Sequence, residues 1–175
     1  VQRFTRSWDE LARSAFEAQS QLQIFSNQLR RSNQDLGEAS RLIDELSAEL
    51  RVPREELAGA AAEMLRYGYS IEQIVQIFRG AAASALLMGR STREGISLVA
   101  DALISERSVL LNTIGITENL SVAYQRYARQ LGVTVDQLTA QQRAEAATQM
   151  IVKATAAEVA DLETLFRGYG GAVAE

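Results

Sequence analysis

The chain has 175 residues, enough for one domain with a hydrophobic core; 47% of them are hydrophobic and only one is proline. It contains no cysteine and no histidine, which excludes disulfides, thiolate metal sites and every catalytic arrangement that needs an imidazole. The formal net charge is −4 and the densest basic spot is the pair Arg30-Arg31, so we expect no tight nucleic-acid binding.

The sequence shows neither a membrane span nor a signal peptide. The longest nearly apolar run covers residues 81–88 and is too short for a membrane span, which needs roughly 20 residues. The start is polar and amphipathic, unlike a signal peptide. Because the first residue is Val1 and not methionine, we expect a piece of a longer protein.

The first fifty residues carry apolar side chains in alternating steps of four and three, which predicts a coiled-coil-like helical region over residues 1–52. Only one of the fourteen positions is polar: Phe4, Trp8, Leu11, Ala15, Ala18, Leu22, Phe25, Leu29, Ser32, Leu36, Ala39, Ile43, Leu46 and Leu50. Gly37 and the stretch 33–35 leave two alternatives open, one long helix with a soft point near 33–37 or two helices that break there.

Such a long apolar stripe should not remain in water, so it should pack against later helices of the same chain or against another copy. We expect four of its large members to be the most buried and to be the candidate protein-interaction residues. These are Trp8, Leu22, Phe25 and Leu29.

Residues 53–167 show a succession of helix start and stop signals, and the fold class that they predict is all-α, with six or seven helices in the whole chain and no sheet. Pro53 opens the first helix of this part, and Thr117 is expected to cap another. Glycines 68, 89 and 132 should end helices with positive φ. Four capping boxes are expected, at Ser70/Gln73, Ser91/Glu94, Thr134/Gln137 and Thr139/Gln142.

The last helix should run from about Ala140 to Phe166, and residues 168–175 should form a glycine-rich tail or linker. The glycines of this tail could suggest a phosphate cradle, but no lysine and helix follow them, so a helix terminator is the better interpretation.

The side chains offer little chemistry. Glu63, Glu106 and Glu118 are carboxylates that a lysozyme-like site could use, but solvated faces and a helix start explain them equally well. Tyr124 and Tyr127 share a helix face with apolar neighbours and are expected in the core. We therefore expect no enzymatic activity, no cofactor and no metal.

The stretch from Gly115 to Ile151 combines glycine turns, caps and a tyrosine in a fixed order. Its members are Gly115-Ile116, Leu120, Tyr127-Ala128, Leu131-Gly132, Val135, Leu138-Thr139, Gln142, Arg143 and Ala146. This order resembles the tail tape measure proteins of long-tailed bacteriophages and prophages. The resemblance is strongest over residues 57–162, where Gly68-x-Ser70 and Ala85-x-x-x-Gly89-x-Ser91 also fit.

The resemblance implies a structural virion protein that sets tail length and occupies the tail tube lumen until DNA ejection. It also implies assembly in the cytoplasm of the bacterial host, and contacts with copies of itself, the tail tube and tail assembly chaperones. The alternative from the residues alone is a helical adaptor domain that binds a protein through the Phe4–Leu50 stripe.

Overall fold

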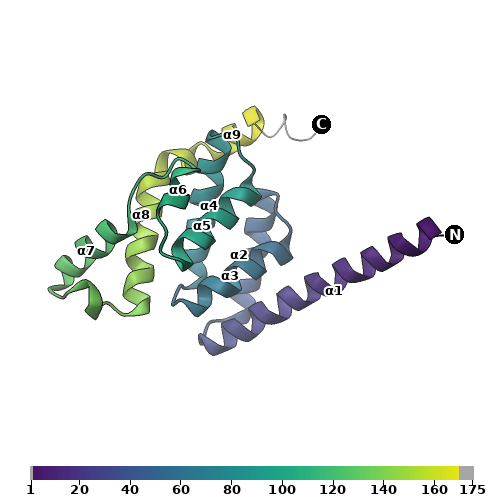
Figure 1. The fold of residues 1–175 in the computed structure, drawn as a ribbon, viewed down its shortest axis with the longest axis horizontal. Helices are drawn as coiled ribbons and strands as arrows, with labels where there is room; N and C mark the ends of the chain where they lie inside the picture. Colours follow the sequence, from purple (N-terminus) through teal and green to yellow (C-terminus); the bar gives the residue numbers. More distant parts are fainter. Residues whose placement is uncertain (1, 170–175) are drawn as a thin grey trace.

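The structure is a computed structural model that describes the backbone of residues 2–169 and the side chains of residues 8–168. Over this range the chain is all-α, as predicted, and forms nine α-helices and one 3-10 helix with no strand (Figure 1). The first five helices are α1 (Gln2–Arg31), α2 (Leu36–Leu50), α3 (Arg54–Arg66), α4 (Ile71–Leu87) and α5 (Thr92–Ile104). They are followed by α6 (Val109–Asn112), α7 (Leu120–Leu131), η1 (Val135–Gln137), α8 (Ala140–Ala160) and α9 (Leu162–Tyr169).

The expected count of six or seven helices is wrong because two predicted helices are each divided. The helix that begins at Thr92 ends at Ile104, where Glu106 takes a φ of 54°, and α6 follows as a separate turn. The last helix divides at Asp161, and its second part, α9, continues through Gly168 to Tyr169. The expected tail therefore begins later than residue 168, and residues 170–175 lie outside the described part.

The N-terminal region is two helices, which decides between the two alternatives. Asn33 takes a φ of 53°, and the Asp35 carboxylate accepts a hydrogen bond from the backbone N–H of Glu38 at 2.6 Å. The Gln34 side chain then fixes the break to the domain. Its Oε1 accepts from the Ile71 backbone N–H at 2.7 Å, and its Nε2 donates to the Tyr69 carbonyl at 3.5 Å. The break is thus stabilised by contacts far away in sequence.

Helix α4 is the centre of the domain. It is apolar on nearly all sides, as expected of a helix that other elements surround, and it contacts α2, α3, α5, α8 and α9. Two glycines allow the closest approaches. A Cβ at Gly95 of α5 would lie 2.6 Å from the Ala81 carbonyl oxygen of α4, and a Cβ at Gly80 would collide with Thr155 Oγ1 of α8. The alanines of α4 therefore serve close packing between helix backbones.

The junction signals are largely confirmed. All four capping boxes are present, and Gly68, Gly89 and Gly132 have φ values of 91°, 71° and 69°. The expected cap at Thr117 is wrong, because α7 begins later and Asn119 caps it by accepting from the Ser121 N–H. Ser108 supports the same helix start, since its Oγ accepts from the Leu120 N–H at 2.9 Å.

One buried cluster extends from α1 to α9. It includes Phe25 and Leu29 of α1, the inner face of α2, most of α4 and Leu165 of α9. Figure 1 shows α1 leaving this body: its C-terminal half lies along α3, whereas its N-terminal half projects beyond the other helices. We call residues 8–18 of α1 the arm.

Candidate interaction surface

The four residues expected to be the most buried of the stripe do not behave alike. Phe25 and Leu29 are 3% and 0% exposed and belong to the core, and Leu22 is partly buried against it. Trp8 is 67% exposed, so the expectation that it is buried is wrong within one chain. Helix α1 extends past the surface of α3 (Figure 1), and the first side chains that the structure describes, those of residues 8–13, are all exposed. Phe4 lies outside the residues whose side chains are described.

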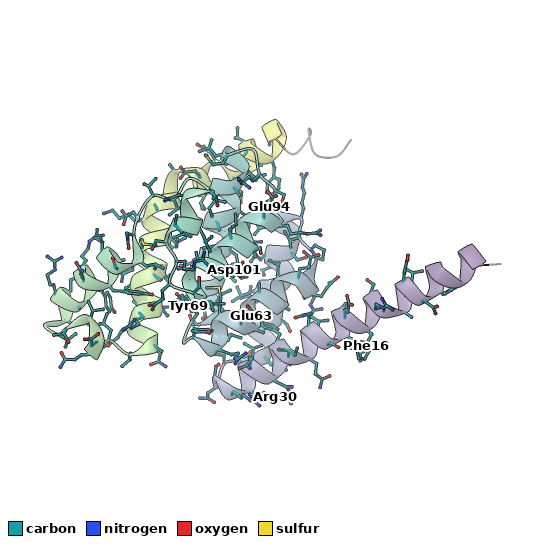
Figure 2. The ribbon with its side chains drawn as sticks, in the orientation of Figure 1. Phe16, Arg30, Glu63, Tyr69, Glu94 and Asp101 are labelled. Atoms are coloured by element: carbon teal, nitrogen blue, oxygen red, sulfur yellow. The ribbon has the colours of Figure 1, made fainter. Side chains whose placement is uncertain are left out.

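The arm exposes several large apolar side chains close together. Leu11 is 61% exposed and Ala15 is also exposed, so the apolar stripe continues from the core into solvent without interruption. Phe16 is 71% exposed (Figure 2). As the residue after Ala15 it lies about 100° round the helix from it, and therefore off the stripe. Contiguous exposed apolar surface of this kind is typical of a protein-interaction site.

A groove of about 550 Å³ lies where the arm meets the domain, between α1, α3 and α5. Its floor is made of small or apolar residues, among them Ala18, Gly59, Ala60, Ile96 and Ala100. Its rim is acidic and is made by Glu17, Glu55, Glu56, Glu63 and Asp101, with Arg93 as the one basic residue of the lining. Arg93 is itself paired with Glu56, its Nε lying 2.7 Å from Glu56 Oε2.

Gly59 of α3 lies beside the groove and faces Gln21 of α1. A Cβ at this position would lie 2.5 Å from Oε1 of Gln21, so the glycine leaves room for the glutamine side chain. Figure 2 labels Glu63 on α3 and Asp101 on α5, two of the acidic residues that border the groove. The sequence gives small residues and carboxylates in both helices, but only the packing of three helices places them around one hollow.

A second cluster joins α7, α8 and the loop before α6. The Arg143 guanidinium lies 5.3 Å from the centre of the Tyr124 ring and its Nη1 is 3.0 Å from Oε1 of Glu106. Burial, reinforced by the nearby Glu106 carboxylate, raises the pKa of Tyr124 to about 12. Burial likewise raises the pKa of Tyr69, with smaller contributions from Tyr124 and Glu106. The cluster fixes the α7–α8 hairpin to the domain.

The two other carboxylates considered for chemistry, those of Glu63 and Glu118, occupy different environments. Glu63 is exposed at the groove, and Glu118 precedes α7 instead of lying in its first turn, with an oxygen 4.0 Å from Nη2 of Arg126. Within the described residues no three histidine, cysteine, aspartate or glutamate side chains gather in a way that could hold a metal ion. In that same part of the chain, no helix has the length and apolar character needed to cross a membrane.

The residues of the Gly115–Ala146 stretch, on which the family resemblance mainly rests, lie in the α7–η1–α8 hairpin and its entry. Gly115 turns the chain with a φ of 82°, and Ile116, Leu120, Ala128, Leu138 and Ala146 are buried. Tyr124 is buried as expected and Tyr127 is partly buried, whereas Leu131 is 44% exposed at the end of α7. Each motif residue thus has a structural task in a turn, a cap or a contact, apart from Leu131.

No known family model matches the chain, and no solved structure is significantly similar to it.

Proposed function

We propose that the chain is a segment of a phage tail tape measure protein, a structural protein of the virion. The observation that carries this proposal is the order of signals from Gly115 to Ala146. In the fold, these residues build one hairpin of two helices around a glycine turn at Gly132 and a double cap at Thr134 and Thr139. Such a hairpin supports a role in shape and assembly, because its residues serve packing and turns.

The proposed activity is mechanical. A tape measure needs a defined length along the tail, and a continuous helix supplies about 1.5 Å per residue. A compact unit of about 115 residues, the length of residues 53–167, instead spans only about 35 Å. In this fold these residues share their core with α1 and α2. The two states of this segment would therefore contribute very differently to the length of a tail.

In-frame deletion and in-frame duplication of residues 53–167 in the phage that encodes the chain test the proposal. If the segment is extended in the tail lumen, electron microscopy should show tails shortened or lengthened by about 170 Å. If it stays folded, the change should be about 35 Å or less. Mass spectrometry of purified virions provides the control. Peptides of the segment absent from wild-type virions, together with unchanged tail lengths in both variants, would overturn the proposal.

A second candidate is a helical adaptor domain that binds a protein through the Phe4–Leu50 stripe. The exposure of Trp8 and Leu11 on the arm favours it, since these side chains are available to a partner. The parent chain separates the two candidates. Many hundreds of helical residues rich in alanine, glutamine and serine favour the tape measure, whereas a short parent chain favours the adaptor.

A further inference from the structure

We propose that the arm of α1 pairs in antiparallel orientation with the arm of a second copy of this chain, so that Trp8 of each copy enters the acidic-rimmed groove of the other beside Ala18. The resulting dimer has two-fold symmetry, in which the same surface serves both copies. This inference goes beyond the proposed function and does not depend on it, because it concerns only the arm and the groove.

Continuity with the core is the first argument. The stripe that buries Phe25 and Leu29 inside one chain continues through Ala18, Ala15, Leu11 and Trp8 at the same heptad spacing. A sustained heptad on a helix favours a second helix packed along it. From Ala18 and Gln21 onward α3 lies beside α1, whereas Trp8, Leu11 and Ala15 of the arm remain exposed.

The order of side-chain sizes along the arm identifies the neighbour. Its outer stripe positions, Trp8 and Leu11, are large, and its inner positions, Ala15 and Ala18, are small. In an antiparallel pair with its axis near residue 13, Trp8 faces Ala18 of the other copy and Leu11 faces Ala15. Every layer then combines a large residue with a small one, which fills space between two helices efficiently. A parallel pair would place Trp8 against Trp8 and Ala15 against Ala15.

The groove provides the seat for the tryptophan. Ala18 lines it together with Gly59, Ala60 and Ala100, so its floor leaves room for a large ring beside Ala18. The indole N–H is a hydrogen-bond donor with no acceptor function, and the rim offers carboxylate oxygens from Glu55, Glu56 and Glu63. Trp8 therefore matches the groove in both its apolar body and its polar edge.

The positions that flank the stripe near the axis of this pairing are uncharged. Ser14 lies beside the two-fold axis and faces Ser14 of the other copy, and Ala12 does the same on the opposite flank. Gln21 lies one heptad from Ser14 on the same side of α1, and both line the groove. Small uncharged residues near the axis allow the two helices to approach without like-charge repulsion.

The mass of the species that the 175-residue chain forms in solution tests the pairing. Sedimentation velocity over protein concentrations up to roughly 100 μM should show the wild type shifting from monomer to dimer. Trp8→Asp should raise the dissociation constant by at least about tenfold, because it removes the aromatic anchor and places a carboxylate in an acidic groove. Phe16→Asp is the matched control. It adds the same charge at a residue of similar exposure that lies about 120° round the helix from the stripe, and it should leave the constant within about twofold.

A cysteine pair tests the orientation, because the chain has no cysteine of its own. Ser14→Cys should form an intermolecular disulfide under mild oxidation, whereas Gln21→Cys should not, since antiparallel pairing separates position 21 from its counterpart. A parallel pair would treat these heptad-equivalent positions alike.

Three outcomes would overturn the proposal: a wild type that stays monomeric over the whole concentration range, equal effects of the Trp8 and Phe16 variants, or equal cross-linking at positions 14 and 21. Far-UV circular dichroism melts of all variants at the lowest concentration should match that of the wild type, since both aspartates replace exposed residues. Virion incorporation is not part of this test, so its result is separate from that of the proposed function.

Discussion

The contact between α4 and α5 allows a quantitative prediction about Gly95. The residue lies inside α5, where alanine is the better helix former by about 0.5–1 kcal/mol. In this fold, however, the added methyl group would lie 2.6 Å from the carbonyl oxygen of Ala81 and 2.7 Å from the Cβ of Ala85. Neither atom belongs to a flexible side-chain end, so the two helices must move apart.

Overpacking of this kind costs about 1–3 kcal/mol, which exceeds the gain in helix propensity. We therefore expect Gly95→Ala to lower the free energy of unfolding by about 1–2 kcal/mol. For a domain of this size, the melting temperature should fall by about 2–4 °C per kcal/mol. Urea unfolding followed by circular dichroism at 222 nm measures the free energy, and a thermal melt measures the temperature.

Gly37→Ala is the matched control for this prediction. Gly37 is also helical, but the only atom close to an added Cβ is Oδ1 of Asp35 at 3.3 Å, the oxygen that accepts the Glu38 N–H, and it needs to shift by only a few tenths of an ångström. The substitution should therefore be neutral or stabilise by up to about 1 kcal/mol. If Gly95→Ala were as stable as the wild type while Gly37→Ala behaved as expected, close backbone packing between α4 and α5 would be refuted.

Three further outcomes follow from other contacts. Gly132→Ala should cost about 1 kcal/mol in urea unfolding from backbone strain alone, and Gly68→Ala should cost more, since an added Cβ would also lie 3.0 Å from the backbone of Ala140; equal losses would contradict this. Because the Tyr124 pKa is raised from 10.0 to about 12, the stability from its neutral hydroxyl is complete below pH 10 and is lost as pH rises towards 12. Tyr124→Phe should flatten the fall in unfolding free energy over that window by up to about 1.4 kcal/mol per pH unit, and an unchanged slope would contradict the assignment. Phe25→Asp should lower the melting temperature equally at all protein concentrations, because Phe25 packs inside its own chain; concentration-dependent loss would place it between chains.

Local signals predicted the junctions well because their physics lies within a few residues. A serine or threonine followed three residues later by glutamine or glutamate satisfies the free N–H groups of a helix start on its own. Where the expectation failed, a distant contact decided the outcome. Thr117 has the side chain of a cap, but Ser108, twelve residues before Leu120, accepts the Leu120 N–H and α7 begins there.

The candidate surface could be predicted only in part. Heptad spacing identifies the stripe that contains Trp8 and Phe25, but spacing is the same for a residue in a core and for one in solvent. Which of them is buried depends on where the surface of α3 ends, and this length relation between two helices is a tertiary property. The groove has the same origin, because α1, α3 and α5 each supply one side of it.

The stripe of α1 also shows why burial and interaction must be argued separately. Phe25 and Leu29 are buried in the core of their own chain, so their substitution reports on the stability of one chain. Trp8 and Leu11 contribute little to that stability, because they remain exposed, and a long apolar arm costs solubility unless something covers it. The arm also changes from large to small residues along its length. This change is useful when a second arm runs in the opposite direction, and this asymmetry, more than the apolar character itself, makes another copy of the chain the neighbour to test first.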